Sequence, residues 1–292
     1  MTSAALPAWR SLLYVPANAP RFVDKAHQRG ADAIILDLED SVPPAEKAAA
    51  RDALAAAIPR VAQGGADVLV RINQPLRLAV ADLQAAVLPG VCAVVVTKVE
   101  GASHVRLLDE LVSQLEHERG LHVGGLRFVL VVETPQAWLD MQGIFRASPR
   151  NIGAVLGSED FSLACDAAPT DDTLQLPKQQ LIIQARACGL LPFGLIASVA
   201  DFADPERLLA MAQRSRRFGF AGATCVHPSQ VTAVNQAFGA SAAEIAQARQ
   251  LVAAFEQAER EGRGAIRVDG RMVDAPVVAR ARRLLQRAPG AG

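Results

Sequence analysis

The fold is most clearly indicated by the stretch Arg127-Phe128-Val129-Leu130-Val131-Val132-Glu133, in which five apolar residues are followed by a carboxylate. An uninterrupted apolar run of this kind is typical of a parallel strand that is covered on both faces. Similar runs recur along the chain at Leu12–Pro16, Ala33–Leu38, Val68–Ile72, Ala93–Val99, Ile152–Gly157, Leu191–Ala197 and Gly222–Val226. Segments with helical apolar periodicity separate these runs, so the sequence predicts eight consecutive β/α units.

The number and size of these units predict a closed (β/α)8 barrel, the TIM barrel, over residues 1–238. An open doubly wound sheet is the alternative, because periodicity determines the number of strands better than it determines closure. The longest connection is expected at Phe161–Pro177, and long loops often cover an active site or an interface.

The pattern changes after residue 238. Ser241-x-x-Glu244 is a capping box that predicts a helix to about residue 261. Asp269-Gly270 is a dipeptide favoured in tight hairpin turns, and a last helix is expected at Pro276–Arg287. Residues 239–292 are therefore predicted to form a C-terminal helix-hairpin-helix extension, which acts as a lid on the same subunit or as an arm that packs on a neighbouring one.

The composition excludes several classes of function. The 292 residues include 30 Lys+Arg and 30 Asp+Glu, and this zero net charge argues against general binding of nucleic acid or of an anionic membrane. The apolar runs are far shorter than the roughly 20 residues that span a bilayer, and the N-terminus lacks the pattern of a secretion signal, so a cytoplasmic protein is expected. The four cysteines contain no C-x-x-C pair, which argues against a zinc site or a disulfide framework.

Carboxylates at two neighbouring strand ends predict a metal site. Active sites of β/α barrels lie at the carboxyl ends of the strands, where this sequence places Glu133 and, one unit later, Asp160. Hard oxygen ligands of this kind suit Mg²⁺. Arg71, at the end of the third run, would place a permanent cation beside an oxygen that gains negative charge during the reaction. The combination predicts chemistry through an enolate or alkoxide.

Several blocks of the sequence, in this order, strongly resemble the citrate lyase beta-subunit-like family within the HpcH/HpaI aldolase superfamily: Arg10–Pro16, Asp37–Pro43, Arg71–Asn73, Lys98–Glu100, Val132–Pro135, Gly157–Phe161, His227–Gln230 and Asp269–Pro276. The resemblance runs from about Arg10 to Arg282. It implies a TIM barrel of the pyruvate/phosphoenolpyruvate type, assembled as a homotrimer or a dimer of trimers. It also implies a Mg²⁺-dependent enzyme, with Mn²⁺ as a possible substitute. Such an enzyme cleaves or forms a 3-hydroxyacyl-CoA such as malyl-, citramalyl- or citryl-CoA, with an acyl-CoA and a 2-oxo acid as the other partners.

The resemblance also assigns roles to individual residues. It implies metal ligation by Glu133 and Asp160 and contact of Arg71 with the keto-acid oxygen. It places the general acid/base, contributed in several relatives by the arm of a neighbouring subunit, on Asp274. Capping of the last helix is the alternative role of Asp274.

The coenzyme A contacts implied by the resemblance fall at the end of the first strand, on Tyr14, with Arg21 and Lys25 as phosphate partners. Arg21 and Lys25 lie about one helical turn apart and could instead form a solvated face. Glu39 and Asp40, which follow the second run together with Asp37, are further candidates. One of these three acids is expected to orient Arg71 or to bind metal-bound water, and the others to be structural.

Other readings of the same residues stay open at this point. A lysine at a strand end, such as Lys98, could form a Schiff base with the substrate, as in one class of aldolase. The neighbouring carboxylates disfavour this mechanism because they keep the lysine protonated. A malyl- or citramalyl-CoA thioesterase, an aldolase for free hydroxy-oxo acids and a citrate lyase beta subunit that needs partner subunits are alternatives to an independent CoA-ester lyase. Thr97 and residues 195–202 depart from the commonest family pattern, which leaves the identity of the substrate open.

Overall fold

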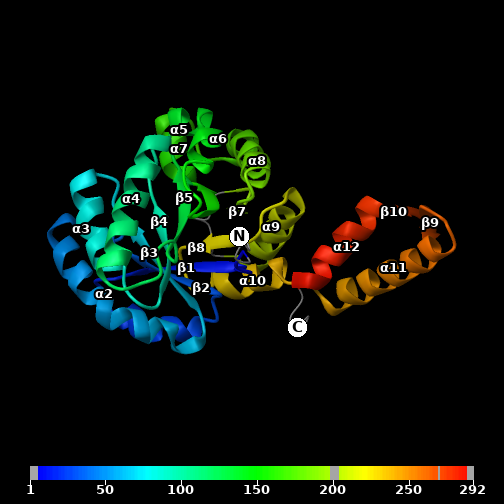
Figure 1. Cartoon of the computed structure of the whole chain (residues 1–292), viewed down its shortest axis with the longest axis horizontal. Coiled ribbons are helices and arrows are strands. Elements are labelled where there is room, and N and C mark those ends of the chain that lie inside the picture. The colour runs from blue at the N-terminus through cyan, green and yellow to red at the C-terminus, as the bar shows by residue number, and fades with distance from the viewer. Residues whose placement is uncertain (1–5, 198–203, 269, 288–292) are drawn as a thin grey trace. The chain divides into compact units, whose positions relative to one another are not determined.

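Parallel strands form one eight-stranded sheet in the order β7-β6-β5-β4-β3-β2-β1-β8 in the computed structural model, which describes residues 6–197, 204–268 and 270–287 (Figure 1). The two ends of this sheet meet where Phe193 forms a parallel bridge with Gly222 and the Gly194 amide donates to the Gly222 carbonyl at 2.9 Å. The predicted TIM barrel is thereby confirmed, and the open sheet is wrong. The strands are β1 (Ser11–Pro16), β2 (Ala33–Asp37), β3 (Asp67–Ile72), β4 (Val91–Val96), β5 (Arg127–Val132), β6 (Asn151–Leu156), β7 (Leu191–Phe193) and β8 (Ala223–Cys225).

Helices follow the strands and cover the outside of the barrel. Several begin at the residue types that cap helices: Thr134 caps α5, and Asp204 caps α9 directly before a proline. The helices are α1 (Pro20–Ala26), α2 (Lys47–Val61), α3 (Leu76–Ala86), α4 (Ala102–Glu118), α5 (Pro135–Leu139), α6 (Met141–Phe145), α7 (Ser158–Ala164), α8 (Asp171–Ala187), α9 (Pro205–Phe218) and α10 (Gln230–Phe238), with short 3₁₀ turns at His27–Arg29, Pro44–Glu46 and Ala62–Gly64.

Strand β2 shows why the barrel strands are continuously apolar. Ala33 and Ile35 belong to the apolar cluster that also contains Phe193, whereas the alternate residues Ile34 and Leu36 belong to a larger cluster that includes residues of the surrounding helices. Each of these β2 side chains is completely buried. Both faces of the strand therefore require apolar side chains, one for the barrel interior and the other for contact with the helices.

Two expectations about local structure are wrong. Residues 161–177 are not a long loop, because α7 extends to Ala164 and α8 begins at Asp171 and includes Pro177. Thr170 and Thr173 form a capping box that starts α8 before Pro177, and the helix continues past this proline to Ala187. Strand β7 ends at Phe193 rather than at residue 197, since Gly194 has a φ of 148°, outside the range of a strand.

The chain divides into two compact units, Met1–Phe238 and Gly239–Gly292. The second unit contains α11 (Ala242–Arg260), the antiparallel strands β9 (Ala265–Val268) and β10 (Arg271–Asp274), and α12 (Ala275–Arg287). Ser241 and Glu244 form the predicted capping box, and Phe255, Val273 and Val278 form a small core of their own. The helix-hairpin-helix prediction is confirmed, although Asp269 of the expected turn lies outside the described residues, as do residues 198–202 of the segment that departs from the family pattern.

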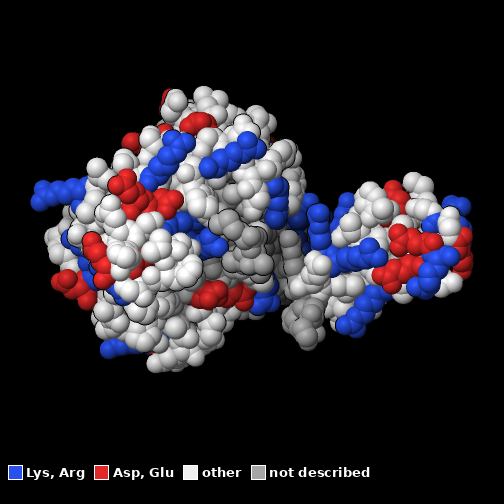
Figure 2. All heavy atoms as spheres, in the orientation of Figure 1, with Lys and Arg blue, Asp and Glu red and all other residues white. Residues whose placement is uncertain are grey.

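Charges of both signs are interspersed on the face of the molecule that Figure 2 shows, in keeping with the zero net charge. Within the described ranges, no helix has the length and apolarity needed to cross a membrane. The four cysteines are free thiols.

Candidate active site

A cavity of about 280 Å³ lies at the carboxyl ends of the barrel strands. Its lining includes Tyr14 from β1, Arg71 from β3, Glu133 directly after β5, and Asp160 in the first turn of α7. These side chains come from segments far apart in the sequence, and the parallel order of the strands brings them to one end of the barrel.

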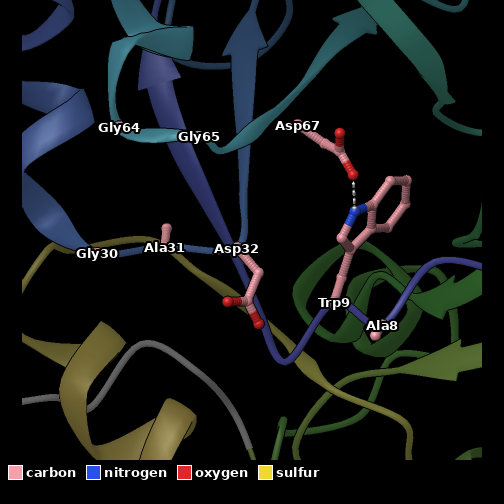
Figure 3. Close-up of a pocket in the computed structure, with 8 residues that line it drawn as sticks. All are labelled: Ala8, Trp9, Gly30, Ala31, Asp32, Gly64, Gly65 and Asp67. Atoms are coloured by element: carbon pink, nitrogen blue, oxygen red, sulfur yellow. Dashed lines mark hydrogen bonds between the residues drawn. The ribbon is translucent and has the colours of Figure 1, made fainter. Parts of the chain in front are cut away.

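A second cavity, of about 350 Å³, lies at the opposite ends of β1, β2 and β3 (Figure 3). Its polar side chains already have partners, because Trp9 Nε1 donates to Asp67 Oδ2 at 2.6 Å and Asp32 pairs with Arg10 at 2.7 Å. The amino-terminal face of a TIM barrel contributes to stability rather than to catalysis. The cavity at the carboxyl ends is therefore the candidate active site, although it is the smaller of the two.

Arg71 is held in place by the three acids that follow β2. Its Nε and Nη2 each donate to one oxygen of Asp37 at 2.6 Å, and its Nη1 lies 3.0 Å from Glu39 and 3.4 Å from Asp40. Its guanidinium carbon also lies 4.6 Å from the centroid of the Tyr14 ring. A two-point pair of this kind restricts the orientation of the guanidinium. Asp37 is thus the acid that orients Arg71.

Both partners of the Arg71–Asp37 pair are charged. Burial raises the pKa of Asp37, but hydrogen bonds from Arg71 and Ser41 outweigh this and keep the pKa below its ordinary value. Burial opposes the charge of Arg71, but the hydrogen bond to Asp37 and the nearby carboxylates raise its pKa above the ordinary value. The arrangement presents a fixed positive charge to the cavity.

Lys98 connects this cluster to the acids of the next strands. It follows β4 with a φ of 48°, a left-handed conformation that is uncommon for residues other than glycine, and its backbone N–H donates to Glu133 Oε2 at 2.6 Å. Its ammonium donates to Glu39 and lies 3.4 Å from Asp40 and 3.6 Å from Asp160. Burial alone would lower the pKa of Lys98, but Glu39, Glu133 and Asp40 raise it. Lys98 therefore keeps its proton, which disfavours a Schiff-base role.

Glu133 occupies a position that only glycine at residue 157 permits. A methyl group on Gly157 would lie 2.3 Å from Glu133 Oε1, so the carboxylate packs directly against the backbone that follows β6. Burial raises the pKa of Glu133 to about 8, with the charge of Asp160 as a smaller cause in the same direction. A cation bound to this carboxylate would favour its charged form.

Glu133 and Asp160 form an oxygen donor set that fits a magnesium ion, which commonly takes one or two protein carboxylates and keeps other positions for water and substrate. The described part of the chain contains no group of three or more His, Cys, Asp or Glu side chains that could hold a metal ion. A metal held here would therefore rest on these two carboxylates.

Of the other predicted site residues of the barrel, Asp40 lines the cavity, whereas Arg21, Lys25 and Glu39 do not. Arg21 and Lys25 are exposed on α1, where the Arg21 guanidinium carbon lies 4.5 Å from the Phe22 ring centroid. Glu39 is buried and contacts Arg71 and Lys98, while Asp40 lines the cavity. Asp274 belongs to the second unit, and its Oδ1 accepts a hydrogen bond from the Val277 amide at 3.3 Å, as a residue that caps α12 does.

Lys178 also lines the cavity and was missed by the sequence analysis. It lies in α8 and is 2% exposed. Its Nζ donates to the carbonyls of Ala197 at 2.9 Å and Ile196 at 3.3 Å. The sequence does contain a sign that Lys178 is buried. Lys178 lies four residues after Leu174 and three before Leu181, and this spacing places it on the apolar face of the helix.

Comparison with known proteins places this architecture in a family. The model of the HpcH/HpaI aldolase/citrate lyase family matches residues 10–228. The chain is 32% identical to the citrate lyase subunit beta of Leuconostoc mesenteroides subsp. cremoris over 280 residues, which covers 95% of this chain and 92% of that protein. It is 34% identical to a (3S)-malyl-CoA thioesterase of Cereibacter sphaeroides over 284 residues, with coverage of 96% and 94%.

Comparison with solved structures points to the same family. The CitE protein of Mycobacterium tuberculosis, in a complex with magnesium, acetoacetate and coenzyme A, superposes with a TM-score of 0.77 at 30% identity, and the match covers 96% of this chain and 98% of that one. The fold, the family match along the barrel and the full-length relatives together show that this chain belongs to the HpcH/HpaI aldolase/citrate lyase family.

Proposed function

We propose that the protein is a Mg²⁺-dependent CoA-ester lyase that cleaves or forms a 3-hydroxyacyl-CoA, with an acyl-CoA and a 2-oxo acid as the other partners. The observation that carries this proposal is the presence of Arg71, Glu133 and Asp160 in the lining of one cavity. The relative from M. tuberculosis, which binds magnesium, acetoacetate and coenzyme A together, supports the same combination of ligands here.

Three charged residues of the cavity lining have roles in this reaction. Glu133 and Asp160 would hold the magnesium ion, which supplies a Lewis acid for the oxygens of the 2-oxo acid half. Arg71 would place its positive charge beside the oxygen that gains or loses negative charge as the C–C bond forms or breaks. Asp37 keeps the guanidinium in one orientation throughout, so little reorganisation accompanies the change in charge.

The remaining predicted residues complete the proposal. A cavity of about 280 Å³ has room for a small acid but not for a whole coenzyme A thioester, so most of the coenzyme must lie outside it. The exposed Arg21 and Lys25 on α1 are available to its phosphates. Asp274, on the arm of a neighbouring subunit of a homotrimer or dimer of trimers, transfers the proton at the enolate carbon.

Product analysis tests the reaction class. Purified protein is incubated with malyl-, methylmalyl-, citramalyl- and citryl-CoA in the presence of Mg²⁺ or of EDTA, and the products are identified by mass spectrometry. We expect one of these thioesters to give an acyl-CoA and a 2-oxo acid, with EDTA abolishing the reaction. Turnover of equal rate in EDTA would contradict the proposed metal dependence.

A thioesterase is the second candidate, because the malyl-CoA thioesterase of C. sphaeroides is 34% identical to this chain over nearly its whole length. Hydrolysis through the same cavity would give free coenzyme A and an intact hydroxy acid instead of an acyl-CoA and a 2-oxo acid. The same product analysis therefore decides between the two reactions.

Substitution of Gly157 by alanine tests the position of Glu133. The added methyl group must displace the carboxylate, because it would lie 2.3 Å from Oε1, and we expect Mg²⁺ affinity to fall by roughly 10- to 100-fold in calorimetric titration. Gly101→Ala is the matched control, since a methyl group there meets no atom within 4 Å. Unchanged Mg²⁺ affinity in folded Gly157→Ala protein would argue against Glu133 as a ligand.

A further inference from the structure

Lys98 contacts both of the proposed metal ligands, one through its backbone and the other through its side chain. Its amide N–H donates to Glu133 Oε2 at 2.6 Å, and its Nζ lies 3.6 Å from Asp160 Oδ2. The same ammonium donates to Glu39 and lies 3.4 Å from Asp40. A single residue therefore links the two proposed ligands to the acids that follow β2.

The contact with Glu133 depends on the backbone of Lys98 and not on its side chain. Lys98 lies two residues after Val96, where β4 ends, and its φ of 48° is a left-handed conformation that costs energy for a residue with a side chain. In this conformation the Lys98 amide meets the Glu133 carboxylate. Every residue except proline carries such an N–H. The position of Glu133 should therefore survive the loss of the ammonium.

The ammonium of Lys98 is anchored on the β2 side of the cluster. The side chain of Glu39 is 7% exposed, whereas that of Asp160 is 40% exposed and its ion pair with Lys98 is long. A long ion pair with an exposed partner contributes little to stability. Asp160 can therefore exchange this ammonium for another cation while Lys98 stays bound to Glu39.

A magnesium ion on Glu133 and Asp160 would compete with the Lys98 ammonium for Asp160. Both cations are attracted to the same carboxylate, and two positive charges a few ångströms apart repel each other. The pKa of Lys98 is raised, so its ammonium stays charged at neutral pH. The side chain that neutralises Asp160 therefore also opposes the binding of a second cation there.

We propose that Lys98 is the counter-ion of the metal ligands, which neutralises Asp160 when no metal is bound and lowers the affinity of the site for Mg²⁺. This inference rests on the proposed function and adds a control of metal binding to it. Magnesium binds by displacing the ammonium from Asp160. The ammonium limits repulsion among the acids of the cluster before the metal arrives, and metal binding is weaker as a consequence.

Calorimetric titration of Mg²⁺ into the full-length protein, without substrate, tests this proposal. Lys98→Met removes the charge and keeps an unbranched side chain and the backbone N–H. We expect this variant to bind Mg²⁺ at least about fivefold more tightly than the wild type, since removal of one like charge about 4 Å away gives this factor even in bulk water. Equal or weaker Mg²⁺ binding by Lys98→Met would overturn the role of Lys98.

Three further substitutions separate charge from backbone conformation and from folding. Lys98→Arg keeps the charge and should bind Mg²⁺ as the wild type does. Lys98→Gly removes the ammonium and favours the left-handed conformation, so it should also bind Mg²⁺ more tightly than the wild type, and it decides the question if Lys98→Met does not fold, as judged by circular dichroism. Lys98→Val disfavours a positive φ and should bind Mg²⁺ more weakly than Lys98→Met.

Arg60→Met is the matched control for the change in net charge. Arg60 pairs with Asp24 at 3.0 Å, and both side chains are more than half exposed. Its loss removes one positive charge from the surface of α2 and should leave the Mg²⁺ affinity as it is in the wild type. A gain equal to that of Lys98→Met would show a general effect of net charge and would overturn the specific role of Lys98.

The possible results also distinguish this proposal from the proposed function. Mg²⁺ binding that is the same in the wild type and in Lys98→Met would overturn the role of Lys98 and leave the lyase proposal intact. If neither protein binds Mg²⁺ and product formation continues in EDTA, the proposed metal site is wrong as well.

Discussion

Glu133→Gln is expected to abolish magnesium-dependent turnover and to weaken Mg²⁺ binding by more than the roughly 10- to 100-fold that follows loss of an outer-shell partner. The substitution keeps the size of the side chain and its acceptor for the Lys98 amide, but it removes the negative charge that would balance the metal. Calorimetry measures the metal affinity, and the formation of acyl-CoA and 2-oxo acid measures the turnover.

Glu100→Gln is the matched control for this substitution. Glu100 follows the neighbouring strand β4, but it is exposed and accepts a hydrogen bond from the Gln74 side chain at 2.8 Å rather than lining the cavity. The control should bind Mg²⁺ and turn over as the wild type does. Comparable Mg²⁺ binding in Glu133→Gln and Glu100→Gln would contradict the metal assignment.

Arg71→Met is expected to lower both kcat and stability. Loss of a donor aimed at a developing oxyanion typically costs about 10²–10³-fold in kcat. The substitution also leaves the buried carboxylate of Asp37 without its charged partner, and breaking a buried pair costs about 3–5 kcal/mol. Steady-state kinetics measures the first effect, and urea unfolding at neutral pH measures the second.

Arg150→Met is the control that separates the effect of Arg71→Met on kcat from its effect on stability. Arg150 is 2% exposed and pairs with Asp109 at 2.5 Å and Glu116 at 2.6 Å, but it directly precedes β6, at the end of the barrel away from the candidate site. We expect a similar loss of stability with kcat near the wild-type value at temperatures where the variant is folded. A similar loss of kcat in both variants would indicate that Arg71 has only a structural role.

The pH dependence of stability provides a further check on Arg71→Met. The pKa of Asp37 is lowered in the folded protein, so its pairing stabilises the fold above the ordinary carboxyl pKa of about 4, and this contribution is lost as the pH falls through the lowered pKa. The difference in unfolding free energy between wild type and Arg71→Met should therefore be largest near neutral pH and decrease in acid. A difference that does not change with pH would contradict the pairing.

The architecture of the barrel could be predicted because its signals are local. Burial on both faces of a strand makes the strand continuously apolar, and polar residues such as Glu133 appear where the strand ends. Capping at Ser241 likewise involves residues only three positions apart. The predicted loop at 161–177 is wrong, because the capping box at Thr170 starts α8 before Pro177.

The sequence by itself determined the number of strands, their parallel β/α order, the C-terminal extension and the polar residues that follow the strands, since each depends on contacts between near neighbours or on periodic burial. Closure of the sheet into a barrel was decided by the tertiary structure. Only the tertiary structure decided that Asp37 orients Arg71, that Lys98 binds Glu133 through its backbone, and that Lys178 lies in the cavity wall. These partners are separated by many residues and meet because neighbouring strands pair in parallel, β2 with β3 and β4 with β5. The energy of a charge depends on its burial and on the charges around it, and both are properties of the folded chain.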